Sequence, residues 1–166
     1  MSVGGQNVTE PAWLDADQQR SWRALVLGMT LLTHRLDDEL RRGFGLSLTE
    51  YEILVRLAES TEREMRMAAL ADSLCLSRSR ITHTVARMEA AGLVERRASQ
   101  QDGRGVVAVM TDGGEQRLQE ASPSHVAAVR EHLVDLVDPS DFRSLGRVMD
   151  AVSDALVAQN PDAEIR

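Results

Sequence analysis

The sequence lacks lysine, contains a single cysteine and has no long apolar run. Cys75 has no partner for an internal disulfide, which excludes a disulfide-stapled scaffold and fits a reducing compartment. Charged residues interrupt every apolar stretch, and the N-terminus has neither the basic start nor the apolar core of a secretion signal. We therefore expect a cytoplasmic protein that does not span a membrane.

The motifs of common enzyme chemistry are also absent from the sequence. It contains no phosphate-binding loop, no His-Glu-x-x-His pair, no Gly-x-Ser-x-Gly elbow and no dinucleotide-binding glycine pattern. His34, His125 and His132 have no cysteine near them, and histidines seven residues apart are too distant to chelate zinc unaided. We expect no enzymatic activity, no cofactor and no metal site.

The distribution of charge is uneven. All 19 basic residues are arginine, which we attribute to a GC-rich genome rather than to a binding requirement. The net charge of −7 argues against a nucleic-acid partner for the chain as a whole. Segment 77–105, however, holds six arginines and three acids and so carries +3, which leaves −10 for the remainder. The positive charge is concentrated in one segment.

Length and composition predict one domain over residues 1–166, since 43% hydrophobic and 27% charged residues are ordinary for a globular protein. Residues 1–17 are predicted to form a loose polar arm. Apolar residues then recur at steps of three and four, which predicts a long amphipathic helix within 18–45 that stops at Gly43. The recurring residues are Leu25, Met29, Leu32, Leu36 and Leu40.

A second helix is predicted to start at Thr49, because Thr49 and Glu52 match the S/T-x-x-E capping box. Tyr51, Leu54 and Leu57 would then face inward. A short third helix is predicted over 67–73.

Ser77 is expected to cap a fourth helix, which Gly92 ends, and Ile81, Val85 and Met88 are predicted to lie on one apolar face of this helix. Two strand patterns flank a glycine-bracketed turn near 102–105, which predicts a β-hairpin closed by Thr111. The order helix, helix, hairpin in 46–111 is that of a winged helix-turn-helix. The expected fold is mainly α with a small β-hairpin.

Residues 112–160 are predicted to form two further helices. Thr111 or Asp112 would cap the first, Pro123 should kink or restart it, and Pro139 would open the second. Apolar residues in the last helix form a seam that suits either a second copy of the chain or packing within its own chain. The seam consists of Leu145, Met149, Val152 and Leu156.

The polar face of the fourth helix is the candidate DNA-binding surface. Arginine can donate two bonds to guanine, and the helix N-terminus suits a phosphate. The candidates are Ser77, Arg78, Ser79, Arg80, Thr82, His83 and Arg87, together with Asp102 and Arg104 in the hairpin turn. The sequence does not decide whether Arg78 and Arg80 read bases or grip phosphates. Arg104 suits a narrow minor groove, and Asp102 would orient an arginine or brace the turn.

These residues resemble a known family. The segment from Asp102 through Arg104 to Thr111, preceded by Leu76-Ser77-Arg78-Ser79 and by 88–97, looks like the MarR family (multiple antibiotic resistance regulators). The resemblance implies a homodimer with intertwined terminal helices, at 18–45 and 112–160, that binds a palindromic operator. It also implies repression of transcription until a small molecule binds.

The resemblance further implies an effector pocket between the dimerisation helices and the winged domain, with His34 and Tyr51 as candidate lining and a phenolic or aromatic acid as ligand. A urate ligand is not expected, because Thr84 stands where urate-responsive relatives have an arginine. Peroxide sensing is not expected either, because Cys75 lies between two leucines in the helix-turn-helix turn. The alternative is a winged-helix protein-protein adaptor or co-regulator that does not bind DNA directly.

Overall fold

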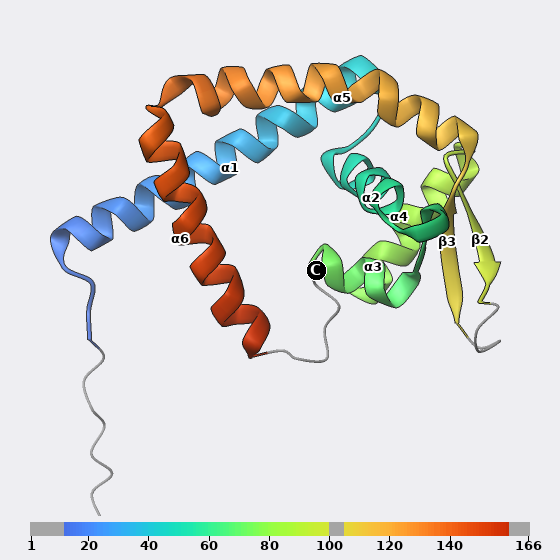
Figure 1. Cartoon of the computed structure of the whole chain (residues 1–166), viewed down its shortest axis with the longest axis horizontal. Coiled ribbons are helices and arrows are strands. Elements are labelled where there is room, and N and C mark those ends of the chain that lie inside the picture. Colours follow the sequence, from blue (N-terminus) through green and yellow to red (C-terminus); the bar gives the residue numbers. More distant parts are fainter. Residues whose placement is uncertain (1–11, 100–104, 160–166) are drawn as a thin grey trace, which may run out of the picture.

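The computed structural model describes residues 12–99 and 105–159, and it is mainly helical with one small sheet (Figure 1). In chain order the elements are α1 (Ala16–Phe44), α2 (Leu48–Glu59), the 3-10 turn η1 (Thr61–Arg63), β1 (Glu64–Arg66), α3 (Met67–Ser73), α4 (Arg78–Ala90), β2 (Val94–Ala98), β3 (Val106–Met110), α5 (Asp112–His132), the 3-10 turn η2 (Val134–Leu136) and α6 (Pro139–Ala158). Helices α2 to α4 and the sheet form a lobe, over which α1 and α5 run together, and α6 lies apart from the lobe, beyond the far end of α5. The predicted fold class is confirmed.

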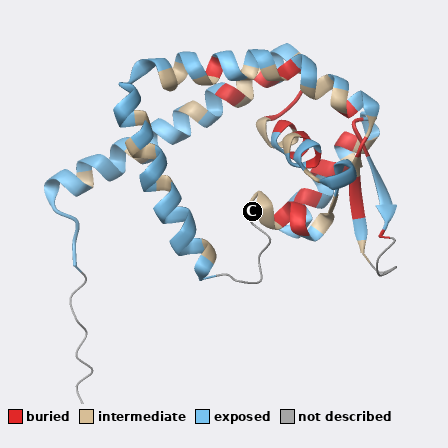
Figure 2. Ribbon diagram, viewed as in Figure 1, coloured by how far each residue is buried: buried red, intermediate tan, exposed pale blue. Residues whose placement is uncertain are grey.

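Most of the hydrophobic core lies within this lobe, and α1 and α5 add Leu40 and Ala121 to it (Figure 2). Ile53, Leu54 and Leu57 of α2 pack with Ile81 and Val85 of α4, and none of these side chains is exposed. Burying a side chain of this size stabilises a fold by about 1.5–3 kcal/mol. The predicted inward face of α2 and apolar face of α4 are therefore confirmed, and together they hold α4 in place.

The terminal helices differ from the lobe, because much of their apolar surface is exposed. Helix α6 contains no buried residue, and Val152 and Leu156 are 46% and 60% exposed. In the first half of α1, Trp22 and Leu27 are 55% and 60% exposed. Exposed apolar surface of this extent on two helices is typical of an interface.

The start of α2 corrects one prediction. Ser47, not Thr49, is the N-cap, and Glu50, not Glu52, completes the capping box. Both pairs have the same spacing, so the local pattern does not choose between them. The carboxylate of Asp37 in α1 accepts a hydrogen bond of 2.8 Å from the backbone N–H of Leu48. This contact makes Leu48 the first residue of the helix.

The end of α1 corrects a second prediction. The helix runs through Gly43 to Phe44 and ends at Gly45, which has φ of 68°. A left-handed residue at this place favours glycine and lets the chain turn. Leu46 can then enter the core, where it is 1% exposed.

The sheet contains one strand more than predicted. The hairpin of β2 and β3 forms, with Val94 opposite Met110, and β1 pairs with the other edge of β3 in the order β1-β3-β2. Strand β1 is only three residues long and two of them are charged. Its formation depends on β3, more than forty positions away, which explains why the sequence pattern does not indicate it.

The remaining boundaries follow local signals. Ser77 caps α4, Thr111 caps α5, and Pro139 lies in the first turn of α6. Helix α5 passes through Pro123 as a single helix, so the predicted restart at this residue is wrong. Within the described residues no helix is long and apolar enough to cross a membrane.

Candidate nucleic-acid interface

The exposed face of α4 is the centre of the candidate site. Ile81, Thr84, Val85 and Met88 form the buried face, whereas the side predicted to bind DNA is solvent-exposed. The exposed candidates are Ser77, Arg78, Ser79, Arg80, Thr82, His83 and Arg87. The Ser77 hydroxyl accepts a hydrogen bond of 3.2 Å from the N–H of Arg80 and so fixes the first turn of this helix.

The three arginines of α4 differ in their partners. Arg78 donates to the carbonyl oxygen of Ala68 and lies 3.0 Å from the Asp72 carboxylate, so it links α4 to α3. Arg87 lies 3.1 Å from Glu50 of α2. The Arg80 side chain forms no hydrogen bond or ion pair with any residue of 12–99 or 105–159. The N–H donors of the Arg80 guanidinium are therefore unused among the described residues.

Glu50 connects the start of α2 to α4. One carboxylate oxygen accepts from the backbone N–H and the hydroxyl of Ser47, both at 2.8 Å, and the other accepts from Arg87. Burial alone would raise the pKa of Glu50. The hydrogen bonds from Ser47 and Arg87 outweigh it and hold the pKa below its usual value. Glu50 is thus a carboxylate beside an arginine of the candidate interface.

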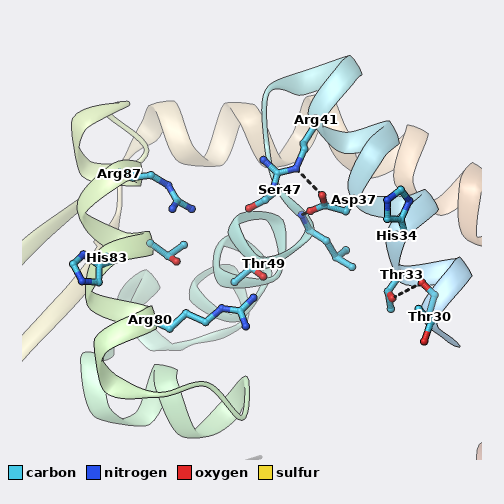
Figure 3. Close-up of a pocket in the computed structure, with 12 residues that line it drawn as sticks. Thr30, Thr33, His34, Asp37, Arg41, Ser47, Thr49, Arg80, His83 and Arg87 are labelled. Carbon is cyan, nitrogen blue, oxygen red and sulfur yellow. Dashed lines mark hydrogen bonds and ion pairs between the residues drawn. The ribbon is translucent and has the colours of Figure 1, made fainter. Parts of the chain in front are cut away.

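A cavity of about 740 Å³ lies between α1, α2 and α4 (Figure 3). Arg80 and Arg87 extend into it from α4, and Arg41, Asp37 and His34 line it from α1. The other lining residues are Thr30, Thr33, Ser47, Leu48, Thr49, His83 and Thr84. Three arginines and one carboxylate give the lining a net positive charge in an acidic protein.

Within this cavity, the Asp37 carboxylate is hydrogen-bonded to other residues of the protein. Its carboxylate accepts from Arg41 at 2.6 Å and from the N–H of Leu48 at 2.8 Å. Burial works to raise the pKa of Asp37, but these two hydrogen bonds outweigh it and lower the pKa. The carboxylate stays charged and partly neutralises Arg41.

The two effector-pocket candidates are not brought together. The His34 side chain is 75% exposed, lines the cavity and lies 3.8 Å from Asp38. Tyr51 is buried on the other side of α2, where its hydroxyl donates to Ser122 at 3.2 Å and its ring lies 4.4 Å from that of His125. The cavity instead contains arginines of α4, which sequence reasoning placed only on the DNA side.

A second hollow, of about 370 Å³, lies where α3, α4 and the sheet meet, and we call it the wing-base hollow. It is lined by Arg66, Met67, Ala68, Arg78, Thr82, Arg96, Gly105 and Val106. Arg96 of β2 donates to Glu89 through Nε at 2.8 Å and through a terminal nitrogen at 2.6 Å. Sequence reasoning missed Arg66 and Arg96 here, because only the pairing of the strands sets them beside α4.

The wing tip, with the candidates Asp102 and Arg104, lies outside the described residues. The strands that lead to it are described, and the N–H of Ser99 donates to the carbonyl of Gly105 at 2.8 Å at its base. No group of three or more His, Cys, Asp or Glu side chains among the described residues could hold a metal ion.

The helix-turn-helix of α3 and α4 followed by a small antiparallel sheet defines a winged helix-turn-helix protein. A family model described as the MarR family matches residues 46–106. Two solved MarR family transcriptional regulators from Streptomyces coelicolor are similar over most of their length. Sco3205, solved in complex with DNA, is 41% identical, with 89% of this chain and 92% of that chain covered and a TM-score of 0.85. AbsC is 39% identical, with 89% and 99% covered and a TM-score of 0.83.

The chain belongs to the MarR family and is a transcriptional regulator with a winged-helix DNA-binding fold. CouR from Rhodococcus jostii RHA1, solved with p-coumaroyl-CoA, is 19% identical with a TM-score of 0.69 over 82% of this chain and 92% of that one, and so shares the fold. A comparison with curated protein sequences returned no significant match.

Proposed function

We propose that this regulator is a cytoplasmic repressor that binds a palindromic DNA operator as a homodimer and releases it when a small molecule binds. The observation that carries the proposal is the exposed polar face of α4, where the Arg80 guanidinium has no partner among the described residues. The relative Sco3205, which was solved in complex with DNA, supports it.

Within this proposal, α4 enters the major groove and its arginines have different tasks. Arg80 reads a base, because its five N–H donors are unused within the described chain. Arg78 and Arg87 are held by Asp72 and Glu50, so they present fixed positive charge to phosphates. Arg104 at the wing tip enters the minor groove, and Asp102 keeps the turn in shape.

The exposed apolar surface of the terminal helices supports the homodimer. Val152 and Leu156 of α6 and Trp22 and Leu27 of α1 would be covered by the second copy. Leu145 and Met149 lie on α6 with them and are half-buried within one chain. A two-fold dimer places its two α4 helices about 34 Å apart, one turn of the duplex, which is why the operator is expected to be a palindrome.

The effector is proposed to be a phenolic or aromatic acid bound in the cavity between α1, α2 and α4. His34 and Arg41 line this cavity from α1, and its positive lining suits an anion. Tyr51 does not line the cavity, but its hydrogen bond to Ser122 fixes α2, which forms one wall of the cavity, against α5. CouR was solved with p-coumaroyl-CoA, a phenolic thioester, which supports this class of ligand.

Substitution of Arg80 tests the DNA-binding part of the proposal. An operator is first selected by the wild-type protein from random duplexes, and its affinity is compared with that of a scrambled duplex. Arg80→Ala should lose about 10- to 100-fold of this discrimination, as expected for one lost guanine contact. Arg56→Ala, an exposed arginine of α2, is the control and should keep it. If the wild type selects no sequence, the adaptor alternative is favoured instead.

A further inference from the structure

Arg80 belongs to two surfaces of the protein at once. It is one of the exposed residues of α4 that we propose to bind DNA, and it also lines the cavity between α1, α2 and α4. Figure 3 shows its side chain extended from α4 into this cavity, toward Thr49 at the start of α2. One guanidinium would therefore serve DNA on one side and a ligand of the cavity on the other.

The position of Arg80 on α4 explains why it belongs to both surfaces. An α-helix has about 3.6 residues per turn, so Ser79 at the middle of the exposed face lies roughly opposite the buried Ile81. Arg80 and Arg87 lie on one flank of the helix, between Ser79 and the buried Thr84. A long side chain on this flank can turn outward to a DNA groove or inward to the cavity.

The three arginines that line the cavity differ in how far their charge is already neutralised. The carboxylate of Asp37 accepts a hydrogen bond of 2.6 Å from Arg41, and the carboxylate of Glu50 lies 3.1 Å from Arg87. The Arg80 side chain has no hydrogen bond or ion pair within the described part of the chain. An anion that enters the cavity therefore meets Arg80 as a cation that no described carboxylate neutralises.

The Arg80 guanidinium cannot bind a guanine and a cavity anion at the same time. A bidentate contact uses two parallel N–H groups of the guanidinium, both with the edge of a guanine and with a carboxylate. The side chain must leave the cavity to reach a groove, so each contact excludes the other. By linkage, a ligand that needs Arg80 and a DNA base that needs Arg80 weaken each other's binding by the same factor.

We propose that Arg80 is shared between the operator and the ligand, and that an anionic ligand releases DNA by holding the Arg80 guanidinium in the cavity. This inference rests on the proposed function and adds the way in which the ligand acts. A carboxylate of the ligand pairs with Arg80 in place of the guanine. The rotation of one side chain removes the base contact, so the lobe need not move relative to the terminal helices.

The substitution Thr49→Glu tests this inference, because it builds a carboxylate into the cavity on the side toward which Arg80 points. An acidic residue in the first turn of α2 is favourable for the helix, so the fold should be kept. The operator selected by the wild type should bind this variant roughly fivefold more weakly, the factor that one exposed arginine–carboxylate pair can supply. Thr49→Asp serves as the second variant if Thr49→Glu does not fold.

Two controls isolate the new carboxylate from other effects of the substitution. Thr49→Gln adds nearly the same bulk without the charge, so the ratio of the affinities of Thr49→Glu and Thr49→Gln reports the charge alone. Thr61→Glu adds the same charge beyond the other end of α2, at an exposed residue that does not line the cavity. Its operator affinity should stay close to that of the wild type.

A double substitution decides whether Arg80 is the group that the carboxylate captures. Added to Arg80→Ala, Thr49→Glu should change the operator affinity by less than about twofold, because the captured group is gone. An equal loss with and without Arg80 would mean that the new charge repels DNA directly, and it would overturn the inference. Unchanged operator affinity of the folded Thr49→Glu variant would overturn it as well.

The same measurements distinguish failure of this inference from failure of the proposed function. A wild type that selects no operator would contradict the proposed function itself. If the wild type selects an operator, Arg80→Ala loses it and Thr49→Glu still binds it as the wild type does, only the shared role of Arg80 is wrong. Circular dichroism melting of each variant identifies any that has lost its fold.

Discussion

The arginines near the proposed DNA-binding surface are the same residue type but differ in their surroundings. Arg78, Arg87 and Arg96 each contact a carboxylate, at 3.0, 3.1 and 2.6 Å respectively. Arg80 has no such contact among the described residues. The acids lower the net charge of the surface but fix the direction of three guanidinium groups. Position on the helix alone does not reveal this difference, because each acid comes from another element or another turn.

Glu50 has two roles, since it caps the start of α2 and pairs with Arg87. The substitution Glu50→Gln separates these roles. Glutamine still accepts a hydrogen bond from Ser47, so the start of α2 should keep most of its stability. Arg87 loses its partner and its full charge becomes available to DNA. We expect the affinity for DNA to rise a few-fold, since an ion pair that is exposed on its Arg87 side is worth about 1 kcal/mol.

The control for Glu50→Gln is Glu59→Gln, which removes the same charge from the end of α2, where Glu59 lies 3.8 Å from Arg56. Titration of labelled operator with each variant is the measurement. An equal gain in both variants would mean that the net charge of the protein, rather than the release of Arg87, controls the affinity.

At the scale of the helices and strands, contacts between elements decide the boundaries. Two capping boxes overlap at the start of α2, and the hydrogen bond from Leu48 to Asp37 of α1 selects the earlier one. Strand β1 forms because β3 offers it a free edge, with Met65 opposite Ala108. In both cases the local sequence permits the observed structure, and a distant residue makes it the more stable choice.

Gly114 lies where α5 packs against the chain that leads into β2. A Cβ built on this residue would overlap the carbonyl oxygen of Leu93 and lie 3.0 Å from the Met110 side chain. Gly114→Ala should therefore lower the free energy of unfolding by about 1–3 kcal/mol, since backbone must move to relieve the overlap. Chemical denaturation followed by circular dichroism measures this change.

Gly43→Ala is the control for Gly114→Ala, because nothing lies within 4 Å of the added methyl group and Gly43 is inside helix α1. Alanine should stabilise the helix there by up to about 1 kcal/mol. Equal stability of the Gly114→Ala variant and the wild type would show that α5 packs more loosely than the structure indicates.

We expect the contact between α1 and α5 to depend on pH through Glu39. Its carboxylate accepts from His132 of α5 at 3.0 Å and from Arg35 at 2.5 Å. The hydrogen bond to His132, with further help from Arg35, lowers the pKa of Glu39 from its usual value of 4.5. A carboxylate with a lowered folded-state pKa stabilises the fold above its unfolded pKa, and this stability is lost as the pH falls through the folded value.

Wild-type protein should therefore lose part of its stability below about pH 4.5, and Glu39→Gln should lose less over that range. Melting temperatures recorded between neutral pH and pH 3 test this, with Glu131→Gln, an exposed acid of α5, as the control. Parallel curves for wild type and Glu39→Gln would rule out a contribution from this contact.

At the scale of the whole molecule, the lobe and the terminal helices have different degrees of burial. The lobe holds the apolar core, whereas α6 has no buried residue and leaves Val148, Val152 and Leu156 exposed. Exposed apolar surface is removed from water when a second chain covers it. The proposed homodimer would bury this surface and would double the number of α4 helices on DNA.

The double substitution Val152→Glu and Leu156→Glu should convert a dimer into monomers, because two charges would be buried against apolar side chains. Sedimentation velocity gives the oligomeric state, and operator affinity should fall steeply when only one half-site is bound. Leu136→Glu in η2, at a residue that is 71% exposed, is the control for an added charge. A dimer that survives the double substitution would place the interface elsewhere.

The sequence by itself determined the features that depend on neighbours a few positions away. These include the buried face of α4, its Ser77 cap and the pairing of β2 with β3, since periodicity and capping are local effects. The sequence also determined that positive charge is concentrated in segment 77–105. The wing-tip residues of this segment lie outside the described part of the chain.

Only the tertiary structure decided the features that depend on residues far apart. It chose Ser47 over Thr49, added β1, separated His34 from Tyr51 and gave Arg87 a partner 37 positions away in Glu50. The free energy of each depends on which surfaces the fold brings together. Those surfaces are formed by residues that are far apart in the sequence, so no local sequence pattern predicts them.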